Sequence, residues 1–503
     1  MSALDRLLQQ SRVVETQRPW PRASVDAAVW QQAAAALAAG ELTLSGLWAE
    51  AEAVHLALLD EAAGRIAVLT LPCPDRRYPS LGASHAPAQR LERAIRDLWG
   101  HEPEGLPDRR PWLDHGRWRE APPSRAAGAP AAAPGYAFLP VEGEGLTQIP
   151  VGPVHAGIIE PGHFRFTTNG ETVVRLEERL GYVHRGLEAL LTGADLAQGC
   201  RLAGRASGDS TVAYALAFAL AAEAALGLEA PPRALWLRAL MAELERLANH
   251  FGDIGAICND ASFSLMQAHC AVLREQVLRA AEGSFGHRLM RDGVVPGGVA
   301  ADLTPEGARA IKALLGEVRR VFPALVELYD NTASLLDRTV ATGVLTPALA
   351  QRFGAGGYVG RASGRAFDAR RLAGPLPYAQ LQFTVPLLEA GDVNARVWIR
   401  IREVEQSLAL AEQLLQRLPA GPVSRPLPAA GAAAEGLALV EAFRGDLLAW
   451  VRLDAGNRIA RGHLRDASWF QWPLLEAVIE GNIVADFPLC NKSFNCSYAG
   501  HDL

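Results

Sequence analysis

The first 118 residues alternate short apolar runs with polar breaks. The runs VHLALLD and RIAVLTL are separated only by EAAG, a spacing typical of a β-hairpin. Further along, AQRLERAIRDLWG repeats apolar residues every three or four positions, which predicts an amphipathic helix. Residues 1–118 are therefore predicted to form a small α/β domain.

Residues 119–136 have a different character. The segment is rich in proline and alanine and shows no hydrophobic period, a composition typical of linkers. A chain of 503 residues is long enough for two domains, and the segment predicts a linker between them.

Beyond the linker, a short β region precedes long helices. The stretch FRFTTNGETVVRLEERLGYV predicts two strands joined by a turn at Asn169-Gly170, because Asn-Gly favours a tight hairpin. Apolar residues recur at helical spacing over 231–251, 304–340 and 393–418, and LLAWVRLDAGNRIARGHLR suggests a second β region. Residues 137–503 are thus predicted to be mainly a helix bundle with small β excursions, and the fold class of the chain is α+β.

Composition narrows the partners and the compartment. The formal net charge is −6, which does not favour nucleic acid as a partner. The six cysteines are scattered, and the start MSALDRLLQQSRVVETQ has no apolar signal core, so we expect a reducing cytoplasm. The longest apolar run, VAYALAFALAAEAALGL, contains Glu223 and many alanines, which favours a buried core helix over a membrane span.

Four segments of the second domain together resemble a known family. They are GPVHAGIIEPGHFRFTTNGETVVRLEERLGYVHRGLEAL, ELERLANHFGDIGAI, RDGVVPGGV and GNIVADFPL. In this order they are similar to the large subunit of membrane-bound, energy-converting NiFe hydrogenases of the formate hydrogenlyase type. They are equally similar to the quinone-site large subunit of respiratory complex I. The N-terminal segment YPSLGASHAPAQRLERAIRDLWGHEPEGLPDRRPW resembles the small subunit that partners that large subunit in complex I.

The resemblance implies the NiFe-hydrogenase large-subunit fold for residues 137–503. It also implies two kinds of partner: an iron–sulfur small subunit that carries the iron–sulfur clusters, and antiporter-like subunits in the membrane. The chain would then lie in the cytoplasm, peripheral on the inner face of the cell membrane.

The metal ligands of the hydrogenase family are missing at the matching positions. That family holds nickel and iron with two Cys-x-x-Cys pairs, because thiolates three residues apart can converge on one ion. The matching positions here are Leu202, Arg205, Ser497 and Gly500. Cys490 and Cys496 are six residues apart, about 20 Å along a strand or about 240° around a helix, so they do not form such a pair. No NiFe centre is expected, and no metal ligand is predicted.

In the complex I relatives, the resemblance implies a quinone head group held by a loop histidine and a tyrosine. His155 and His163 lie in the matching β loop, and with Arg205 they are the candidate cofactor-binding residues. The segment CRLAGRASGD, however, contains no tyrosine, and the nearest one is Tyr214. Quinone therefore stays an open candidate ligand at this stage.

Glu160, His163 and Asp209 are the candidate catalytic residues. Glu160 matches the glutamate that passes protons beside the metal in the hydrogenase family, since a carboxylate in an apolar site can exchange protons near neutral pH. The alternative is a loop carboxylate that caps backbone N–H groups. Asp209 stands where the family has a histidine, and it is either an acceptor or the partner of Arg205 in a structural ion pair.

Further polar residues are candidates for a proton route: His184, Glu188, Glu243, Glu245, His250 and Asp253. Helical spacing places Glu243 near Arg246 and Arg246 near His250 on one side of a helix. In the family this helix lines a polar route toward the membrane subunits, and a solvated or packing face of the bundle is the alternative. His184 and Glu188 match a family motif at the base of the metal cavity, where a structural histidine is the alternative.

The sequence thus predicts a subunit of a membrane-associated oxidoreductase complex that links electron transfer to proton or ion movement without a NiFe centre. Two other interpretations stay open: a non-catalytic scaffold subunit of such a complex, and a true NiFe hydrogenase with unusual ligands.

Overall fold

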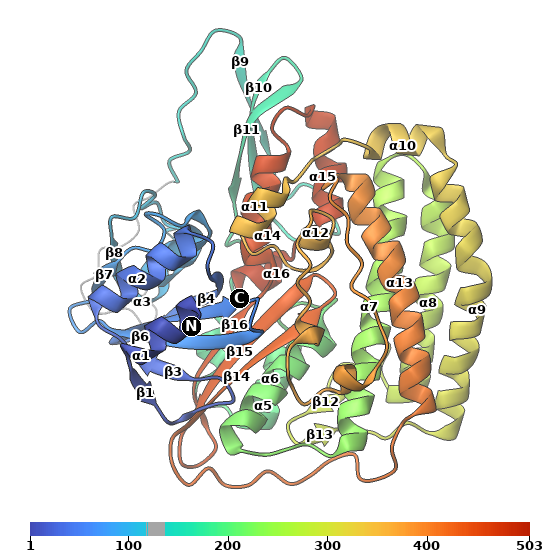
Figure 1. Cartoon of the computed structure of the whole chain (residues 1–503). Coiled ribbons are helices and arrows are strands. Elements are labelled where there is room, and N and C mark those ends of the chain that lie inside the picture. Colours follow the sequence, from blue (N-terminus) through green and yellow to red (C-terminus); the bar gives the residue numbers. More distant parts are fainter. Residues whose placement is uncertain (117, 119–135) are drawn as a thin grey trace.

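The computed structural model describes residues 1–116, 118 and 136–503. A sheet-rich N-terminal part lies beside a larger part dominated by long helices (Figure 1). The predicted linker, 119–136, lies outside the described residues except for Tyr136. The α+β class predicted from the sequence is confirmed.

The N-terminal part is built on a sheet with the strand order β1-β3-β6-β5-β4. These strands are β1 (Arg12–Val14), β3 (Arg22–Ser24), β4 (Thr43–Glu50), β5 (Ala53–Asp60) and β6 (Arg65–Pro72). The predicted hairpin is the antiparallel pair of β5 and β6. The remaining elements are α1 (Ala3–Gln9), α2 (Ala27–Ala38), α3 (Gln89–Trp99), β7 (Arg77–Pro79) and β8 (Glu102–Glu104). The predicted helix is α3, which ends at Gly100 because that residue adopts a positive φ of 70°.

The two parts share a sheet and a buried apolar contact. Strand β2 (Gln17–Arg18) leaves the N-terminal part and pairs with β14 (Ala434–Ala442) at the edge of the sheet β16-β15-β14-β2. Trp48 of β4 packs on Trp450 of β15 (Gly445–Leu453), with ring centroids 5.5 Å apart. The predicted boundary between domains 1–118 and 137–503 therefore runs between two parts that are joined by apolar packing.

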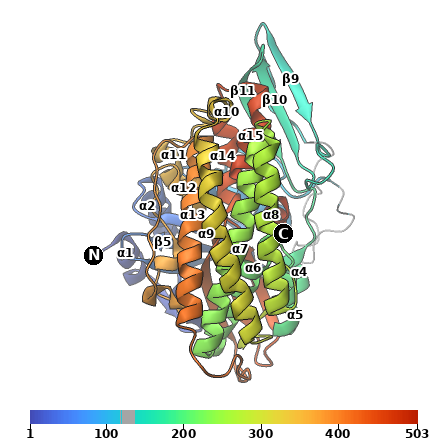
Figure 2. The same cartoon turned by 90° about the vertical axis from the view of Figure 1, so that its right-hand side faces the viewer.

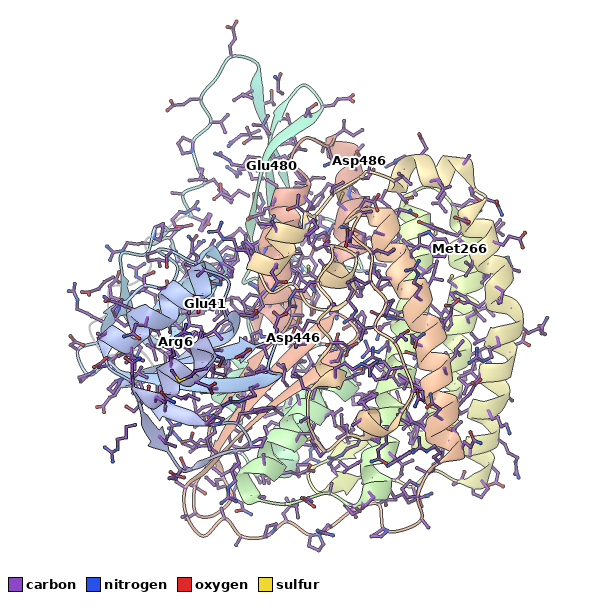
Figure 3. The ribbon with its side chains drawn as sticks, in the orientation of Figure 1. Arg6, Glu41, Met266, Asp446, Glu480 and Asp486 are labelled. Atoms are coloured by element: carbon purple, nitrogen blue, oxygen red, sulfur yellow. The ribbon has the colours of Figure 1, made fainter. Side chains whose placement is uncertain are left out.

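A buried arginine of the larger part also forms a hydrogen bond to the N-terminal part. Arg465 of β16 (Ile459–Arg465) donates to the Ser45 carbonyl of β4 at 2.6 Å and pairs with Asp446, which lies in the interior (Figure 3). Arg6 and Glu41 in the same figure form a pair that is about half exposed, with side-chain exposures of 49% and 50%. Because no water can replace the interior bonds, we infer that Arg465 holds the parts in register.

Long helices form one side of the larger part (Figure 2). They are α7 (Pro232–Asp260), α8 (Ser264–Phe285), α9 (Pro305–Asp330) and α13 (Val393–Gln416). The helices predicted over 231–251 and 393–418 correspond to α7 and α13. The pattern over 304–340 is divided into α9 and α10 (Ala333–Thr339), because Thr332 is extended, with ψ 92°, and interrupts the helical hydrogen bonds.

The longest apolar run is the core helix α6 (Thr211–Leu226), which packs against β14 and β15. Its buried faces extend all round, as expected of a helix enclosed by protein. Within the described part of the chain, no helix is long and apolar enough to cross a bilayer.

The predicted Asn169-Gly170 hairpin is formed by β10 (His163–Asn169) and β11 (Thr172–Arg179). With β9 (Leu146–Val151) they make a small sheet that projects from the body (Figure 1). The second predicted β region is β15 and β16. Shorter elements are α4 (Leu187–Leu191), α5 (Leu196–Ala203), α11 (Pro347–Arg352), α12 (Gly357–Arg361), β12 (Val294–Val295) and β13 (Gly298–Val299).

The chain ends in α14 (Ser468–Val478), α15 (Phe487–Phe494) and α16 (Tyr498–Asp502). Helix α14 contacts β11, and α15 contacts α7 and α13. Helix α16 contacts α14, and all five of its residues are buried.

Candidate functional site

The C-terminal tail, residues 495–503, closes the candidate site. The carboxylate of Asp502 accepts hydrogen bonds from the backbone N–H groups of Gly181 and Val183, at 2.9 and 3.0 Å. His184 Nδ1 donates to the Asp502 carbonyl at 2.7 Å. These bonds hold α16 against the base of the projecting sheet.

Glu160, in the loop between β9 and β10, contacts this tail. Its Oε2 accepts the backbone N–H of Ala499 in α16 at 2.9 Å. Glu160 is exposed, so the apolar enclosure expected around its carboxylate is not present. The geometry is that of a backbone cap whose carboxylate is open to water.

A histidine and a tyrosine meet beside the Glu160 contact. The Tyr498 hydroxyl lies 3.2 Å from His155 Nε2. Burial raises the pKa of Tyr498 and lowers the pKa of His155. Near neutral pH the phenol is thus protonated and the imidazole neutral. A tyrosine therefore lies beside a loop histidine, although segment 200–209 contains no tyrosine.

His163 lies at the start of β10, at the other end of the same loop. Its Nδ1 donates to the Gly152 carbonyl at 3.3 Å, and its ring packs on Phe138 with centroids 5.1 Å apart. Burial lowers the pKa of His163. The structure therefore assigns His163 to the base of the loop and His155 to the contact with the tail.

The four positions that match metal ligands do not converge as ligands. Ser497 Oγ lies 2.9 Å from Ser207 Oγ, which shows that the tail does reach the turn before α6. A Cβ atom at Gly500 would lie 2.7 Å from the Tyr214 hydroxyl and from an Asp466 oxygen, so a cysteine has no room there. Arg205 faces away and pairs with Asp292 at the surface, at 2.7 Å.

These residues do not fit a NiFe centre. Leu202 and Gly500 offer no donor atom, and the hydroxyl of Ser497 is a poor substitute for a soft thiolate. Across the described residues, no group of three or more His, Cys, Asp or Glu side chains could hold a metal ion. The absence of nickel and iron stays a prediction.

Asp209 forms an ion pair, but Arg205 is not its partner. Arg444, in the turn between β14 and β15, binds both carboxylate oxygens, with NH1 2.8 Å from Oδ1. Burial favours the neutral acid, but the charge and hydrogen bonds of Arg444 outweigh it and lower the pKa of Asp209 to about 2. The expected pair with Arg205 is wrong because Arg205, at the end of α5, points toward Asp292. Asp209 is an ionised acceptor near neutral pH.

The predicted polar face of α7 is buried. Glu243 lies 3.5 Å from Arg246, as the helical spacing predicts, and it also accepts hydrogen bonds from Tyr378 and Ser407 at 2.8 and 2.6 Å. Both Glu243 and Arg246 are at most 1% exposed. This face is therefore neither solvated nor apolar: it packs as a network of charges.

His250 and Arg246 meet through a third residue. His250 Nε2 donates to Glu403 of α13 at 2.7 Å, and Arg246 NH1 lies 3.9 Å from the same oxygen. Arg361 binds the other oxygen of Glu403 at 2.7 Å and Glu441 at 2.8 Å. Buried charges require partners of opposite charge, and each of these charged groups has at least one.

We call this set the α7 charge cluster. Its carboxylates are Glu243, Asp253, Asp368, Glu403 and Glu441, and its guanidinium groups are Arg246, Arg361, Arg370 and Arg400. The carboxylates outnumber the guanidinium groups by one, which favours retention of one proton. Burial, together with the charge of Asp368, raises the pKa of Glu441 to about 7. The cluster can therefore take up or release a proton near neutral pH.

The cluster is continuous with the tail. Asp253 binds Arg400 at 3.0 Å and accepts a hydrogen bond from Asn495 at 2.8 Å. The carbonyl of Asn495 in turn accepts a hydrogen bond from Arg444, the partner of Asp209. A chain of polar contacts thus runs from Asp209 to α7.

Glu245 of α7 contacts the first turn of α6. It accepts the backbone N–H groups of Val212 and Ala213 at 2.7 and 3.0 Å. These bonds favour the ionised form, but burial dominates and raises the pKa of Glu245 to about 8.

The raised pKa of Glu245 predicts a pH dependence of stability. Because the folded-state pKa exceeds the unfolded value, this group stabilises the fold below the unfolded pKa and loses that contribution as the pH rises through about 8. We expect the stability of the wild type relative to Glu245→Gln to fall between pH 5 and pH 9 by at least about 1.4 kcal/mol, the equivalent of one pKa unit. Urea midpoints across that range measure it, with exposed Glu229→Gln as control. Parallel wild-type and Glu245→Gln profiles would contradict the assignment.

Glu188 does not join the α7 residues. It binds Arg461 at 2.7 Å and His463 Nδ1 at 2.6 Å, on the side of β16 that faces the N-terminal part. Burial raises its pKa, but Arg461 and His463 together lower it to about 2. Its place is in a cavity between the two parts, described below.

Several residues of the site were not found from the sequence. They are Ser207, Tyr498, Arg444, Glu403, Arg361 and Arg370. Tyr498 had one available signal, since it lies between the tail positions Ser497 and Gly500. The others lie in no local motif, and their partners are distant in the sequence.

A tail folded against a β loop, with a buried charge cluster behind it, matches the resemblance drawn from the sequence. The chain belongs to the family of large subunits of energy-converting hydrogenases and respiratory complex I. Residues 260–432 match the family model "Respiratory-chain NADH dehydrogenase, 49 Kd subunit".

Relatives of both kinds are similar to this chain. It is 31% identical to formate hydrogenlyase subunit 5 of Escherichia coli over 445 residues, 84% of this chain and 77% of the relative. It is 30% identical to hydrogenase-4 component G of the same organism, over 92% of this chain and 82% of the relative. It is 34% identical to one of the NADH-quinone oxidoreductase subunits of Salinispora tropica, over 67% of this chain and 88% of the relative.

The ligand positions make nickel content a direct test. We expect the purified protein to contain far less than one nickel per chain, because Leu202, Arg205, Ser497 and Gly500 replace the thiolates. Elemental analysis of the intact complex measures nickel, with iron as an internal reference for the iron–sulfur partner. About one nickel per chain would instead support the interpretation as a NiFe hydrogenase with unusual ligands.

Proposed function

We propose that this chain is a subunit of a membrane-associated oxidoreductase complex that links electron transfer to proton or ion movement without a NiFe centre. The observation that carries the proposal is the contact of Tyr498 with His155, 3.2 Å apart, at the vacated ligand positions. These groups suit the polar head of a quinone-like acceptor. The electrons would come from iron–sulfur clusters on a partner subunit.

The protonation states of the two groups support this role. The protonated phenol of Tyr498 can donate a hydrogen bond to a carbonyl oxygen of the head group, and the neutral imidazole of His155 can exchange a proton with it. Reduction of a quinone to a hydroquinone consumes two electrons and two protons, one at each oxygen. Tyr498 and His155 would orient the head group and deliver protons, while the partner supplies electrons.

Two routes could replace those protons. Glu160 is open to water and binds the backbone beside Tyr498, so it can exchange protons with solvent. On the inner side, Asp209, Arg444 and Asn495 connect to the α7 charge cluster, whose protonation changes near neutral pH. We propose Glu160 as the outer proton donor and the cluster as the inner store.

The exposed tip of the β9–β10 loop supports a partner at this face. Ile158 is 100% exposed and Val154 is 79% exposed, beside His155 and Glu160. Apolar side chains so exposed at a functional loop favour burial by another subunit. We propose that the iron–sulfur small subunit and the antiporter-like membrane subunits assemble around this chain on the inner face of the membrane.

A non-catalytic scaffold is the second candidate. The bonds between Ser207 and Ser497, and between Arg444 and Asp209, occupy the space around the ligand positions with protein–protein contacts. Polar groups that are bonded to each other in this way would suit a subunit whose only role is to contact other subunits.

The variant Tyr498→Phe separates the two candidates. It removes one hydroxyl and should slow quinone reduction by about tenfold, the scale of one lost hydrogen bond. The assay uses the purified complex, reduced chemically and mixed with a short-chain quinone, with reoxidation of the iron–sulfur clusters followed by absorbance. Tyr329→Phe, which loses a hydrogen bond to Asn394 elsewhere, is the matched control.

A complex that reduces quinone equally well with phenylalanine or tyrosine at this position would remove Tyr498 from the mechanism. A fully assembled wild-type complex that transfers no electrons to quinone would favour the scaffold.

A further inference from the structure

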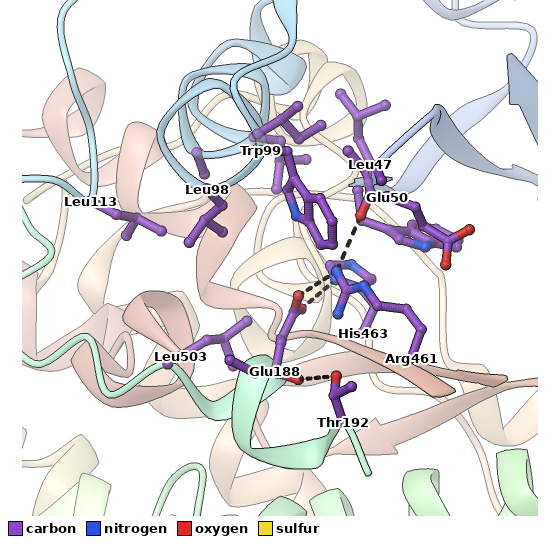
Figure 4. Close-up of a pocket in the computed structure, with 18 of the residues that line it drawn as sticks. Leu47, Glu50, Leu98, Trp99, Leu113, Glu188, Thr192, Arg461, His463 and Leu503 are labelled. Atoms are coloured by element: carbon purple, nitrogen blue, oxygen red, sulfur yellow. Dashed lines mark hydrogen bonds and ion pairs between the residues drawn. The ribbon is translucent and has the colours of Figure 1, made fainter. Parts of the chain in front are cut away.

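A cavity of about 930 Å³ lies between the N-terminal part and the larger, mainly helical part. Helix α3 and strand β4 form one wall, and α4, β16 and the end of the tail form the other (Figure 4). Small-molecule sites are typically of this size and often lie where two parts of a protein meet. The cavity is on a different face of the tail from the contact between His155 and Tyr498.

The walls of the cavity are apolar and rich in tryptophan. Trp48, Trp99, Trp118 and Trp469 line it, together with aliphatic residues of α3 such as Leu98. The guanidinium of Arg461 lies 5.0 Å from the centre of the Trp99 ring, which shows that this ring already accepts a flat group against its face. Such walls favour a ligand with a planar, apolar body.

Most charged groups of the lining are paired with one another. Arg461 and His463 bind Glu188, as the dashed lines in Figure 4 show, and Arg452 binds Glu50 at 2.7 Å. These pairs leave little charge for a ligand to neutralise.

Arg76 is the exception at this cavity. Its guanidinium donates to the Trp99 carbonyl at 2.9 Å, and it has no carboxylate partner within the described residues. A partly buried cation without a counter-charge, at the edge of an apolar space, favours an anionic group.

We propose that this cavity binds a small amphiphile with a planar apolar body against the tryptophans and an anionic end at Arg76. Both parts of the chain contribute walls, so a bound molecule would contact each of them and favour their observed arrangement. The site is independent of the proposed acceptor site, and either can be wrong without the other.

The probe is anilinonaphthalene sulfonate, a planar aromatic anion whose fluorescence rises in apolar surroundings. Its neutral analogue, N-phenyl-naphthylamine, lacks the sulfonate. We expect both dyes to bind the full-length chain with one site each. Ala189→Trp, which fills the cavity from α4, should weaken both dyes by about tenfold or more. Ala333→Trp, on exposed α10, is the matched control and should change neither.

Arg76→Gln tests the anionic end. It should weaken the sulfonate about tenfold and leave the neutral dye within about twofold of wild type. Equal effects on both dyes, or none, would overturn the role of Arg76 alone.

Circular dichroism checks that each variant is folded. If Ala189→Trp does not fold, Thr192→Trp, on the exposed rim of the cavity, decides in its place. Wild-type affinity for both dyes in a folded, filled variant would overturn the cavity as a binding site.

Discussion

Glu403→Gln is expected to lower the free energy of unfolding by about 3–5 kcal/mol, the cost of removing one partner from a buried ion pair. Glu403 is 1% exposed and binds His250 and Arg361, both at 2.7 Å. Glutamine fills nearly the same volume, so the loss would come from charge and not from a cavity. The guanidinium of Arg361 would keep only Glu441 and Asp368 as counter-charges.

Urea unfolding of the purified chain at neutral pH measures this effect. Glu412→Gln is the matched control, because Glu412 lies on the same helix and pairs with Arg319 at the surface, with side chains 43% and 45% exposed. An exposed pair contributes about 1 kcal/mol or less. Equal losses for the two variants would show that the α7 charge cluster is not a tightly coupled network.

The pH dependence gives a second readout for Glu403. Burial opposes its ionisation, but Arg361 and His250 lower the pKa of Glu403 well below its ordinary value. A lowered folded-state pKa contributes stability above the unfolded pKa and loses it as the pH falls. The advantage of the wild type over Glu403→Gln should therefore shrink below about pH 4.3.

Glu160→Gln is expected to lower coupled electron transfer by about a hundredfold, at the low end of the range for a lost proton donor or acceptor. The amide can still accept the N–H of Ala499 but cannot exchange a proton. Complex assembly should be unchanged, because the side chain keeps its shape and its backbone contact. Turnover coupled to proton uptake in reconstituted vesicles measures the effect.

The exposed Glu171→Gln, in the turn after β10, serves as the control for charge removal near the same sheet. If Glu160 is only a backbone cap, its variant should instead cost about 1 kcal/mol of stability or less and turn over normally. That result would leave the inner route from Asp209 to the α7 charge cluster as the proposed source of protons.

Local sequence patterns predicted the elements well. The hairpins at Asn169-Gly170 and at β5 and β6, and the helices α3, α7 and α13, depend on side chains within a few residues of each other. Their apolar periods and turn residues can be recognised within a short stretch of the sequence. The break of α9 before Thr332 was missed, because one extended residue hardly disturbs the apolar period.

The candidate site was predicted only in part, because its contacts join residues that are distant in the sequence. Arg205 and Asp209 lie four residues apart, and the sequence alone favoured a pair between them. In the fold, Asp209 binds Arg444, 235 residues away, and Arg205 binds Asp292. The packing of the fold decides in which direction a side chain points, so a residue can bind a distant partner instead of a near one. A local sequence pattern carries no information on that direction.

The sequence by itself determined which elements form, that four ligand positions lack cysteine, and which family the motifs resemble. Only the tertiary structure decided that Tyr498 meets His155 across 343 positions, and that His250 meets Glu403 across 153. Periodicity and residue type act over a few positions, whereas these contacts depend on how whole helices and the tail pack. A buried polar group must find a partner wherever the fold brings one, and that partner is fixed by the packed chain.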